Sequence, residues 1–224
     1  MSKVSAIIPT LWKAKEFTDH LVNVLIKDES VGEIILIDNA PTDFSYDNEK
    51  VVILRQEENL YVNPSWNLGV RHSSYDKFII FNDDIIIPYR LVSKLEKLLT
   101  EKNGLIGVEM RARISIDKFD EENITRLDRE INLKKVIHRP DWRVLVLGGH
   151  KNSYYYIPNE LRIWHGDDFL FHMSEKNKLS TYVMDDIPIF TQLSTTSNLE
   201  EFDKIKEEDT ENYINVCKEY GINE

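Results

Sequence analysis

Cysteine and glycine are both scarce in this sequence, and each shortage excludes a class of protein. Cys217 is the only cysteine among 224 residues, so the chain can form no intrachain disulfide and no cysteine-based zinc site. The eight glycines form neither the G-x-G-x-x-G pattern of dinucleotide-binding folds nor the Walker A pattern. The sequence therefore argues against a dinucleotide-dependent oxidoreductase and against a P-loop NTPase.

Basic residues and long apolar runs are also lacking. With 28 Lys and Arg against 39 Asp and Glu, the formal net charge is −11, which argues against non-specific binding to nucleic acid. Residues 199–224 hold three Lys against nine Asp or Glu, a balance of −6, and this predicts a solvated C-terminal helix, not an acidic active surface. No apolar run approaches the roughly 20 residues of a membrane span. The first residues enter an apolar strand without a signal-peptide pattern, so we expect a cytoplasmic protein.

Apolar segments of two kinds alternate along the first half of the chain. Short continuous apolar runs predict strands that are buried on both faces, and apolar residues at helical spacing predict amphipathic helices between them. This alternation is typical of βαβ units in a parallel sheet, and thus of the α/β class. The expected strands cover residues 4–8, 33–37, 51–54, 77–81 and 104–110, and the expected helices begin at residues 16, 63 and 88.

The alternation stops after residue 110. Residues 111–135 are highly charged and only weakly periodic, which predicts an excursion over the surface. Strands are expected again at residues 142–147 and 180–184, and helices are expected near residue 166 and over residues 199–220. No internal repeat and no low-complexity linker interrupts the chain, so we expect one domain.

The stretch from Lys77 to Pro88 organises the rest of the chain. Its apolar run ends in Asn82, Asp83 and Asp84. Two adjacent carboxylates at the end of a buried strand repel each other unless one is protonated or a cation lies between them. Carboxylate oxygens are preferred ligands of Mg²⁺ and Mn²⁺, so the stretch predicts a metal site. A plain turn is the alternative, because Asn and Asp are common turn residues.

Two further polar residues follow predicted strands. Thr10 ends the first strand and Asp38 ends the second. In open α/β sheets, ligands bind beyond the carboxyl ends of the strands, so we expect Thr10, Asp38 and Asp84 to converge at one edge. There Asp38 would accept hydrogen bonds from a base or a ribose, and the acidic residues would hold a divalent ion on a diphosphate. The pattern thus predicts a nucleotide site without a glycine-rich loop.

The succession of these motifs resembles that of a known family. The segments that carry the resemblance are Val4-Ser5-Ala6-Ile7-Ile8-Pro9-Thr10, Glu33-Ile34-Ile35-Leu36-Ile37-Asp38-Asn39, Asn59-Leu60, Asn67-Leu68-Gly69-Val70, Asn82-Asp83-Asp84 and Gly166-Asp167-Asp168. In this order they resemble a family 2-type glycosyltransferase with the GT-A fold. The resemblance implies a GT-A-like (Rossmann-like), mostly parallel central sheet flanked by helices. It also implies a single domain over residues 1–224, with a nucleotide-binding half at 1–110, an acceptor-side half at 111–198 and a C-terminal helix at 199–224.

The resemblance also implies roles for the site residues. Asp84, the last residue of a D-x-D-like triplet, would ligate Mn²⁺ or Mg²⁺, which would neutralise charge on the departing diphosphate. Asp168 or Asp167 would be the general base that takes the proton of the acceptor hydroxyl, with Asp168 favoured and Asp167 capping the helix or orienting the acceptor. Trp164 and His165 precede this pair and are predicted to bind the acceptor. The predicted nucleotide-binding residues are Pro9, Thr10, Asp38, Asn67, Asn82 and Asp83.

The sequence departs from the family pattern at two points. Asn82 replaces the first acidic residue of the usual triplet, which weakens the expected ribose or metal contact. No histidine follows His172, so the additional histidine ligand of many GT-A enzymes has no counterpart here. The region where it would lie contains Gln192, Ser194 and Thr195.

Our interpretation is a metal-dependent transfer of a sugar from a nucleotide-sugar donor, with a UDP-sugar favoured, to a glycan or other hydroxyl acceptor. Inversion is expected because a carboxylate base on the acceptor side suits direct displacement. A GT-A-like nucleotidyltransferase is the nearest alternative, but it would favour a basic, G-x-G-rich N-terminal loop, which residues 8–12 do not supply. A degenerate, non-catalytic nucleotide-binding or assembly protein is the third interpretation, favoured by Asn82 and by the missing histidine.

Overall fold

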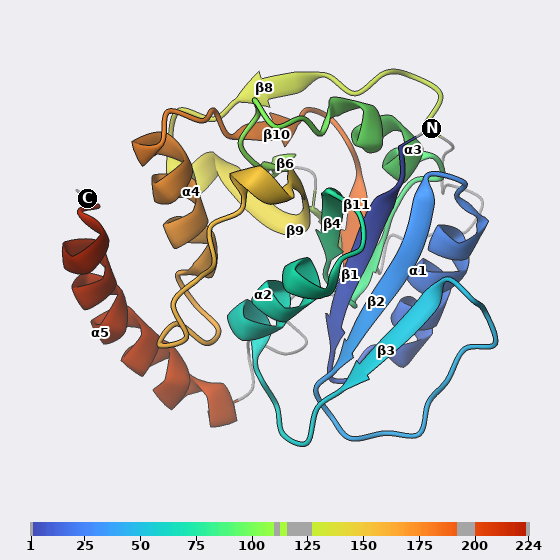
Figure 1. Cartoon of the computed structure of the whole chain (residues 1–224), viewed down its shortest axis with the longest axis horizontal. Helices are drawn as coiled ribbons and strands as arrows, with labels where there is room; N and C mark the ends of the chain where they lie inside the picture. The colour runs from blue at the N-terminus through green and yellow to red at the C-terminus, as the bar shows by residue number, and fades with distance from the viewer. Residues whose placement is uncertain (1, 110–112, 116–126, 192–199, 223–224) are drawn as a thin grey trace.

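The computed structural model describes residues 2–109, 113–115, 127–191 and 200–222 (Figure 1). The strands are β1 Val4–Thr10, β2 Val31–Asp38, β3 Val51–Arg55, β4 Lys77–Phe81, β5 Ile85–Ile86, β6 Ile106–Glu109, β7 Arg113–Ser115, β8 Leu133–Lys135, β9 Trp142–His150, β10 Tyr182–Met184 and β11 Ile189–Thr191. The α-helices are α1 Lys15–Lys27, α2 Val62–His72, α3 Leu91–Leu95, α4 Gly166–Lys176 and α5 Asp203–Tyr220. Short 3-10 helices are η1 Glu96–Leu98, η5 Arg139–Asp141, η6 Lys151–Ser153 and η7 Glu200–Phe202. None of the described helices is long and apolar enough to cross a membrane.

The central sheet is mostly parallel, as the sequence predicts, with the strand order β3-β2-β1-β4-β9-β6-β10-β8. The four strands β3, β2, β1 and β4 run parallel side by side, and β6 pairs parallel with β10. Only β9 and β8 run against their neighbours among these pairs. Thr10 lies opposite Asp38 in the register of β1 and β2. The carboxyl ends of β1, β2 and β4 therefore meet at one edge of the sheet.

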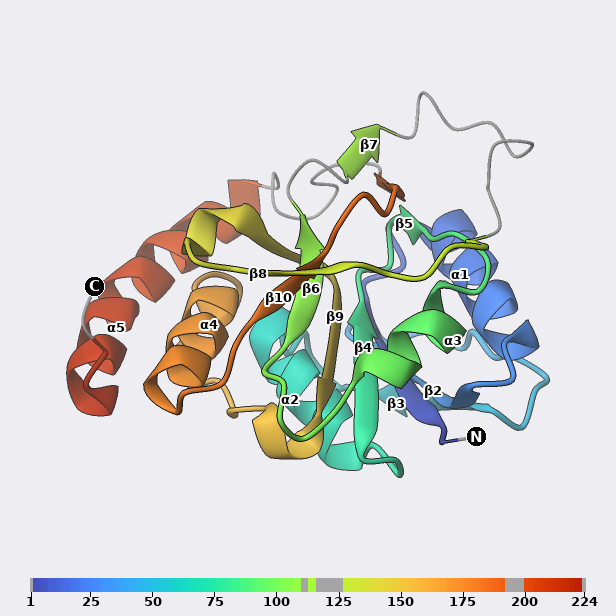
Figure 2. The same ribbon diagram turned by 90° about the horizontal axis from the view of Figure 1, so that it is seen from above.

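Helices cover both faces of the sheet, which explains why its strands are apolar without interruption. Because successive side chains of a strand point to opposite faces, Ala6 and Ile8 of β1 join the core beneath α1 and α3, whereas Ile7 joins the core beneath α2 and α4. The helix α5 lies outside α4 at one end of the molecule in both views (Figures 1 and 2). Tyr213 and Val216 of α5 belong to the second core.

Some boundaries differ from the sequence-based expectation. The helix α2 begins at Val62 with Tyr61 as its N-cap, not at Asn63, because the Asn63 side chain donates to the carbonyl oxygens of Leu161 and Trp164 instead of capping its own helix. The expected surface excursion over residues 111–135 is wrong at its end, where Ile131 is buried and β8 pairs with β10. Residues 110–112 and 116–126 lie outside the described part of the chain.

The C-terminal helix is correct in position and wrong in character. The sequence predicts a solvated helix with Phe202, Ile205, Ile214 and Cys217 roughly on one face. In the structure Ile214 is 55% exposed, whereas Tyr213, Val216 and Cys217 are buried. Asp209, one of the acidic residues that suggested solvation, is 0% exposed. The net charge of the segment therefore did not predict the buried face of the helix, because a single buried carboxylate cannot be distinguished in sequence from its exposed neighbours.

Candidate active site

One cavity of about 670 Å³ opens at the carboxyl edge of β1 and β4. From the N-terminal half it is lined by Pro9, Thr10, Asn82, Asp83 and Asp84, and from the later part of the chain by Trp164, His165, Asp167 and Asp168. These nine residues were all predicted as site residues from sequence. The fold thus joins two polar clusters that lie about eighty residues apart in the sequence.

Thr10 and Asp83 are joined directly at the sheet edge. The Thr10 hydroxyl donates to Asp83 Oδ2 at 2.6 Å and accepts from the Trp12 backbone N–H at 2.8 Å. Burial raises the pKa of Asp83 to about 6, and the neighbouring charge of Asp84 contributes in the same direction, although the Thr10 hydroxyl opposes it. The strand end therefore carries negative charge that the unliganded protein compensates only in part.

Two other predicted nucleotide-binding residues do not line the cavity. Asp38 is fully buried, and its carboxylate accepts from the indole N–H of Trp12 at 2.7 Å and from the Thr42 hydroxyl at 2.7 Å, with the backbone N–H groups of Ala40 and Thr42 as further donors. Four donors occupy about as many lone pairs as a carboxylate offers. Asp38 therefore shapes the loops at the cavity edge, and direct contact with a nucleotide stays a prediction.

Asn67 has a packing role in this structure. Its carboxamide donates to the carbonyl oxygen of Ile157 at 2.8 Å and accepts from the Ile157 N–H and the Tyr154 hydroxyl, both at 3.0 Å. These bonds fix α2 against residues 154–157. The asparagine at this position is thus explained without a ligand, and its predicted nucleotide contact has no support from the geometry.

Further polar and aromatic residues line the cavity without having been predicted as site residues. Asn39 donates to Ser65 Oγ at 2.9 Å and accepts from the Leu60 N–H at 3.1 Å. Tyr61 also lines the cavity and takes a φ of 66°, and the predicted site residue His165 takes a φ of 59°. Such backbone strain is expected at functional sites, where the surrounding structure over-determines it. A turn residue with a positive φ cannot be recognised from sequence, because the same residue types also occur in unstrained loops.

The strand end fits a divalent cation that is shared with a substrate. Among the described residues, no group of three or more His, Cys, Asp or Glu side chains is arranged to hold a metal ion. Asp83 and Asp84 nevertheless supply carboxylate oxygens at one cavity wall. Mg²⁺ is commonly held by one or two carboxylates together with substrate phosphates and water, and this donor set fits that arrangement. Gln192, Ser194 and Thr195, the residues expected where family members carry a histidine, lie outside the described residues.

The second carboxylate pair lies in the first turn of α4. The N-cap of this helix is His165, so Asp167 does not cap it as predicted but accepts from the backbone N–H of Asp168 at 3.1 Å. Arg139 forms ion pairs with both carboxylates, with its Nε 2.7 Å from Asp168 Oδ1. Asp168 Oδ2 lies 2.9 Å from Nδ1 of His165. Sequence reasoning missed Arg139, which follows a charged segment without any recognisable motif.

The surroundings of Asp168 keep it ionised. Burial alone would raise its pKa, but the His165 hydrogen bond and the charges of Arg139, His165 and His172 together lower the pKa of Asp168 below its ordinary value. The position near a helix N-terminus favours the anion as well. Asp168 is 27% exposed and lines the cavity. An ionised carboxylate in this position is able to accept a proton from a bound hydroxyl group.

The loop before α4 carries an exposed aromatic side chain into the cavity. Trp164 is 47% exposed, which sets it apart from the buried Trp12, Trp66 and Trp142. Gly166, which follows two residues later, could not carry a side chain, because a Cβ there would lie 2.1 Å from Asn63 Oδ1. The close approach of Asn63 from α2 therefore determines where this loop passes.

Solved structures with the same arrangement define a class of protein. S. aureus TarS, residues 1–349, matches with a TM-score of 0.60 at 14% identity over 93% of this chain and 70% of that chain. GalNAc-T7 with UDP, GalNAc and Mn²⁺ matches with a TM-score of 0.63 at 13% identity over 96% and 48%. The mannosyltransferase PcManGT from Pyrobaculum calidifontis with GDP-Man and Mn²⁺ matches with a TM-score of 0.57 at 15% identity over 87% and 58%. The fold is that of the GT-A glycosyltransferases, and this chain spans between 48% and 70% of the length of these three structures.

The family follows from the sequence profile. The profile of glycosyl transferase family 2 matches residues 5–156, more than half of the chain, and the chain belongs to this family. Its class is therefore that of the nucleotide-sugar glycosyltransferases, which argues against the nucleotidyltransferase interpretation. No curated protein sequence matches at a significant level. The match ends before α4, so α4 and α5 lie beyond the residues that the profile covers.

Proposed function

We propose that this protein transfers a sugar from a nucleotide-sugar donor to a hydroxyl group of an acceptor, with inversion at the anomeric carbon. The observation that supports the proposal is the shared cavity, which has Asp83 and Asp84 on one wall and Asp167 and Asp168 on another. The first pair suits a donor diphosphate and its cation. The second pair suits an incoming hydroxyl. Residues 1–110 would accordingly form the nucleotide side, and residues 111–198 would form the acceptor side.

The donor would lie at the carboxyl edge of β1 and β4, held by Pro9, Thr10, Asn82 and Asp83. A UDP-sugar is favoured because UDP-GlcNAc is bound in one TarS structure and UDP in the GalNAc-T7 structure, although PcManGT carries GDP-Man. Asp84, with Asp83 beside it, would hold Mn²⁺ or Mg²⁺. When bound, such an ion neutralises negative charge on the diphosphate that leaves.

The acceptor would approach from the side of α4, where Trp164 offers an aromatic face for a sugar ring. In the transfer step, the acceptor oxygen forms a bond to the anomeric carbon while the bond from that carbon to the diphosphate oxygen breaks. Asp168 takes the proton of the attacking hydroxyl, and the nucleoside diphosphate leaves. Displacement from the face opposite the leaving group inverts the configuration. Arg139 keeps the carboxylate ionised before the acceptor arrives.

Thermal unfolding with added nucleotides tests the donor side. We expect UDP to stabilise the protein in the presence of Mn²⁺ and to do so less in its absence, with GDP as the comparison. A ligand at a hundred times its Kd adds about 2.7 kcal/mol to the free energy of unfolding. Stabilisation by neither nucleotide under any metal condition would contradict the proposal.

A further inference from the structure

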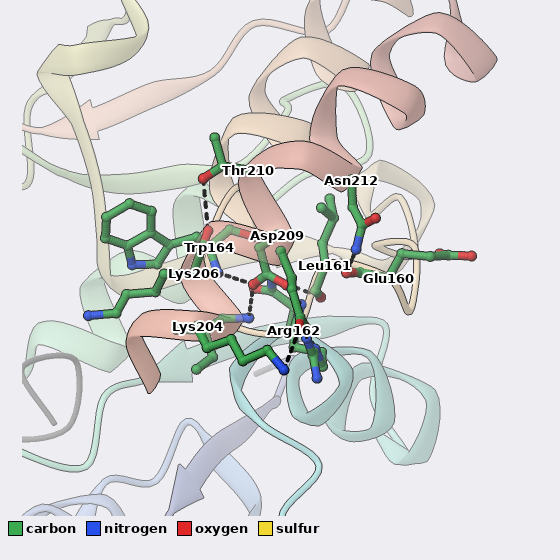
Figure 3. Close-up of polar contacts among 12 residues, drawn as sticks. Glu160, Leu161, Arg162, Trp164, Lys204, Lys206, Asp209, Thr210 and Asn212 are labelled. Carbon is green, nitrogen blue, oxygen red and sulfur yellow. Dashed lines mark hydrogen bonds and ion pairs between the residues drawn. The ribbon is translucent and has the colours of Figure 1, made fainter. Parts of the chain in front are cut away.

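The helix α5 contacts the acceptor side through a buried carboxylate. Asp209 accepts hydrogen bonds from three successive backbone N–H groups, those of Arg162 at 3.0 Å, Ile163 at 2.7 Å and Trp164 at 2.9 Å. Figure 3 shows its side chain pointing from α5 into this loop. Its exposed fraction is 0%, and burying an ionised carboxylate is costly unless it is hydrogen-bonded in this way. Asp209 is therefore the point at which α5 fixes residues 162–164.

Two more residues of α5 reach the residue that follows this loop. The ring of Tyr213 stacks on His165 with centroids 4.6 Å apart and planes 9° from parallel. Thr210 Oγ1 lies 3.2 Å from His165 Nε2, while its own proton goes to the Lys206 carbonyl oxygen at 2.8 Å. The Thr210 hydroxyl oxygen thus faces this ring nitrogen of His165. The opposite ring nitrogen of His165 faces Asp168 Oδ2, so a continuous series of contacts leads from α5 to the proposed base.

The backbone of this loop needs such support. His165 has a φ of 59°, which costs free energy in a residue with a side chain. On the other side of the loop, Asn63 of α2 donates to the Leu161 and Trp164 carbonyl oxygens at 3.1 Å. The loop is thus held through its carbonyl groups by α2 and through its N–H groups by α5. Asp209 is the only buried acidic residue of α5 among the described residues.

We propose that Asp209, Thr210 and Tyr213 of α5 are positioning residues, which orient Trp164 and Asp168 toward the acceptor and leave donor binding unaffected. This inference rests on the proposed function, because it assumes that Asp168 is the base. It makes the C-terminal helix part of the acceptor side, although the helix lies beyond the family-matched residues. None of the three residues lines the cavity, so they act through the loop and not by touching substrate.

The test compares Asp209→Asn and Asp209→Ala with Glu211→Gln, an exposed acidic residue of the same helix. Calorimetry with UDP and Mn²⁺ reports donor-side affinity and the fraction of binding-competent chain. Release of UDP from UDP-GlcNAc reports turnover. Amide hydrogen exchange of residues 160–168 reports how often the loop opens.

We expect kcat to fall tenfold or more in both Asp209 variants and the rate of amide exchange in the loop to rise tenfold or more. UDP affinity, binding stoichiometry and the KM for UDP-GlcNAc should stay within twofold, and Glu211→Gln should match the wild type.

Thr210→Val adds a readout that a purely structural role would not change. Removing the hydroxyl group that faces His165 Nε2 removes a restraint on the ring and weakens the contact between His165 and Asp168. The other charged neighbours of Asp168 are Arg139, His172 and Asp167. The acid limb of the turnover–pH profile should therefore move to higher pH.

Several results would overturn the inference. The inference is wrong if both Asp209 variants turn over within twofold of the wild-type rate, whether or not amide exchange of the loop is faster. A fall in UDP affinity or binding stoichiometry that parallels the fall in kcat would do so as well, because it would indicate general damage. An unmoved acid limb in Thr210→Val would remove the link to Asp168. A wild-type protein that binds neither UDP nor GDP would instead refute the proposed function itself, and one that binds only GDP would be tested with GDP-Man in the same way.

Discussion

Asp83 combines a functional position with a cost in stability. Because its pKa is raised to about 6 by burial, the folded protein holds a proton there that the unfolded chain gives up near pH 4. In the absence of metal, the free energy of unfolding therefore decreases as pH rises from about 4 to about 6. Residues of an active site often reduce stability in this way.

Asp83→Asn should remove this cost. We predict that the metal-free variant gains about 3 kcal/mol of unfolding free energy over the wild type at pH 7.5, since each of the two pKa units corresponds to about 1.4 kcal/mol. The gain should vanish below about pH 4, where Asp83 is protonated in both states. Urea unfolding at both pH values measures it. An equal difference at the two pH values would show that ionisation of Asp83 is not the cause.

Arg139 is predicted to set the pH range of catalysis. Its charge helps to lower the pKa of Asp168, so Arg139→Gln should raise that pKa and move the acid limb of the turnover–pH profile to higher pH. Arg129→Gln is the control, because Arg129 pairs with the exposed Asp186 instead. If the two profiles superimpose on that of the wild type, Asp168 is not the titrating base.

Strand ends explain which site residues could be predicted from sequence. Thr10, Asn82, Asp83 and Asp84 follow apolar runs directly, and the parallel sheet brings such positions together by rule. Arg139 and Asp209 lie in charged, weakly periodic segments, where nothing local distinguishes a buried partner from a solvated one. Their roles depend on which segments pack together, and this is a property of the fold.

Among the elements, the loop between β9 and α4 is the most tightly constrained. A Cβ at Gly166 would lie 2.1 Å from Asn63 Oδ1, and Asn63 cannot move without losing its two bonds to the loop. We predict that Gly166→Ala costs about 1–3 kcal/mol of stability, as overpacking usually does, and reduces turnover more than UDP binding. Chemical unfolding and calorimetry measure the two effects.

A double-mutant cycle tests whether the clash with Asn63 causes the loss of stability in Gly166→Ala. In an Asn63→Ala background the clash is absent, so adding Gly166→Ala should cost clearly less than it does in the wild type. Equal costs in both backgrounds would mean that the glycine is needed for another reason.

At the level of elements, the sequence predicted most strands and helices and missed their partners. The runs that became β1, β2 and β4 are apolar because both faces are covered, whereas the edge strand β3 leaves Val52 exposed. The antiparallel direction of β9 was not predictable, because direction depends on which strands it pairs with. The three-residue strand β8 was missed because it carries too few residues for a periodicity. The start of α2 was misplaced because Asn63 and Pro64 resemble a cap, while the Asn63 side chain binds a loop about a hundred residues later in the chain.

At the scale of the whole molecule, the GT-A fold is retained at very low sequence identity. The TarS, GalNAc-T7 and PcManGT structures share 13–16% identity with this chain, yet the order of strand-end motifs was enough to suggest the class. Glycine-rich phosphate loops are unnecessary here, because carboxylates and a cation would take their place. The helices α4 and α5, by contrast, lie beyond the residues that the family profile covers, and we expect them to contribute to the acceptor specificity of this protein.

The central claim is that one cavity combines a donor side at Asp84 with an acceptor side at Asp168. The most direct measurement pairs calorimetric UDP binding in Mn²⁺ with the rate of UDP release from UDP-GlcNAc, for Asp84→Asn, Asp168→Asn and the exposed control Asp185→Asn. We predict that Asp84→Asn loses Mn²⁺-dependent UDP binding. Asp168→Asn should keep that binding and lose turnover by ~10²-fold or more, the usual scale for a general base. Unchanged UDP affinity in Asp84→Asn, or wild-type turnover in Asp168→Asn, would contradict the claim.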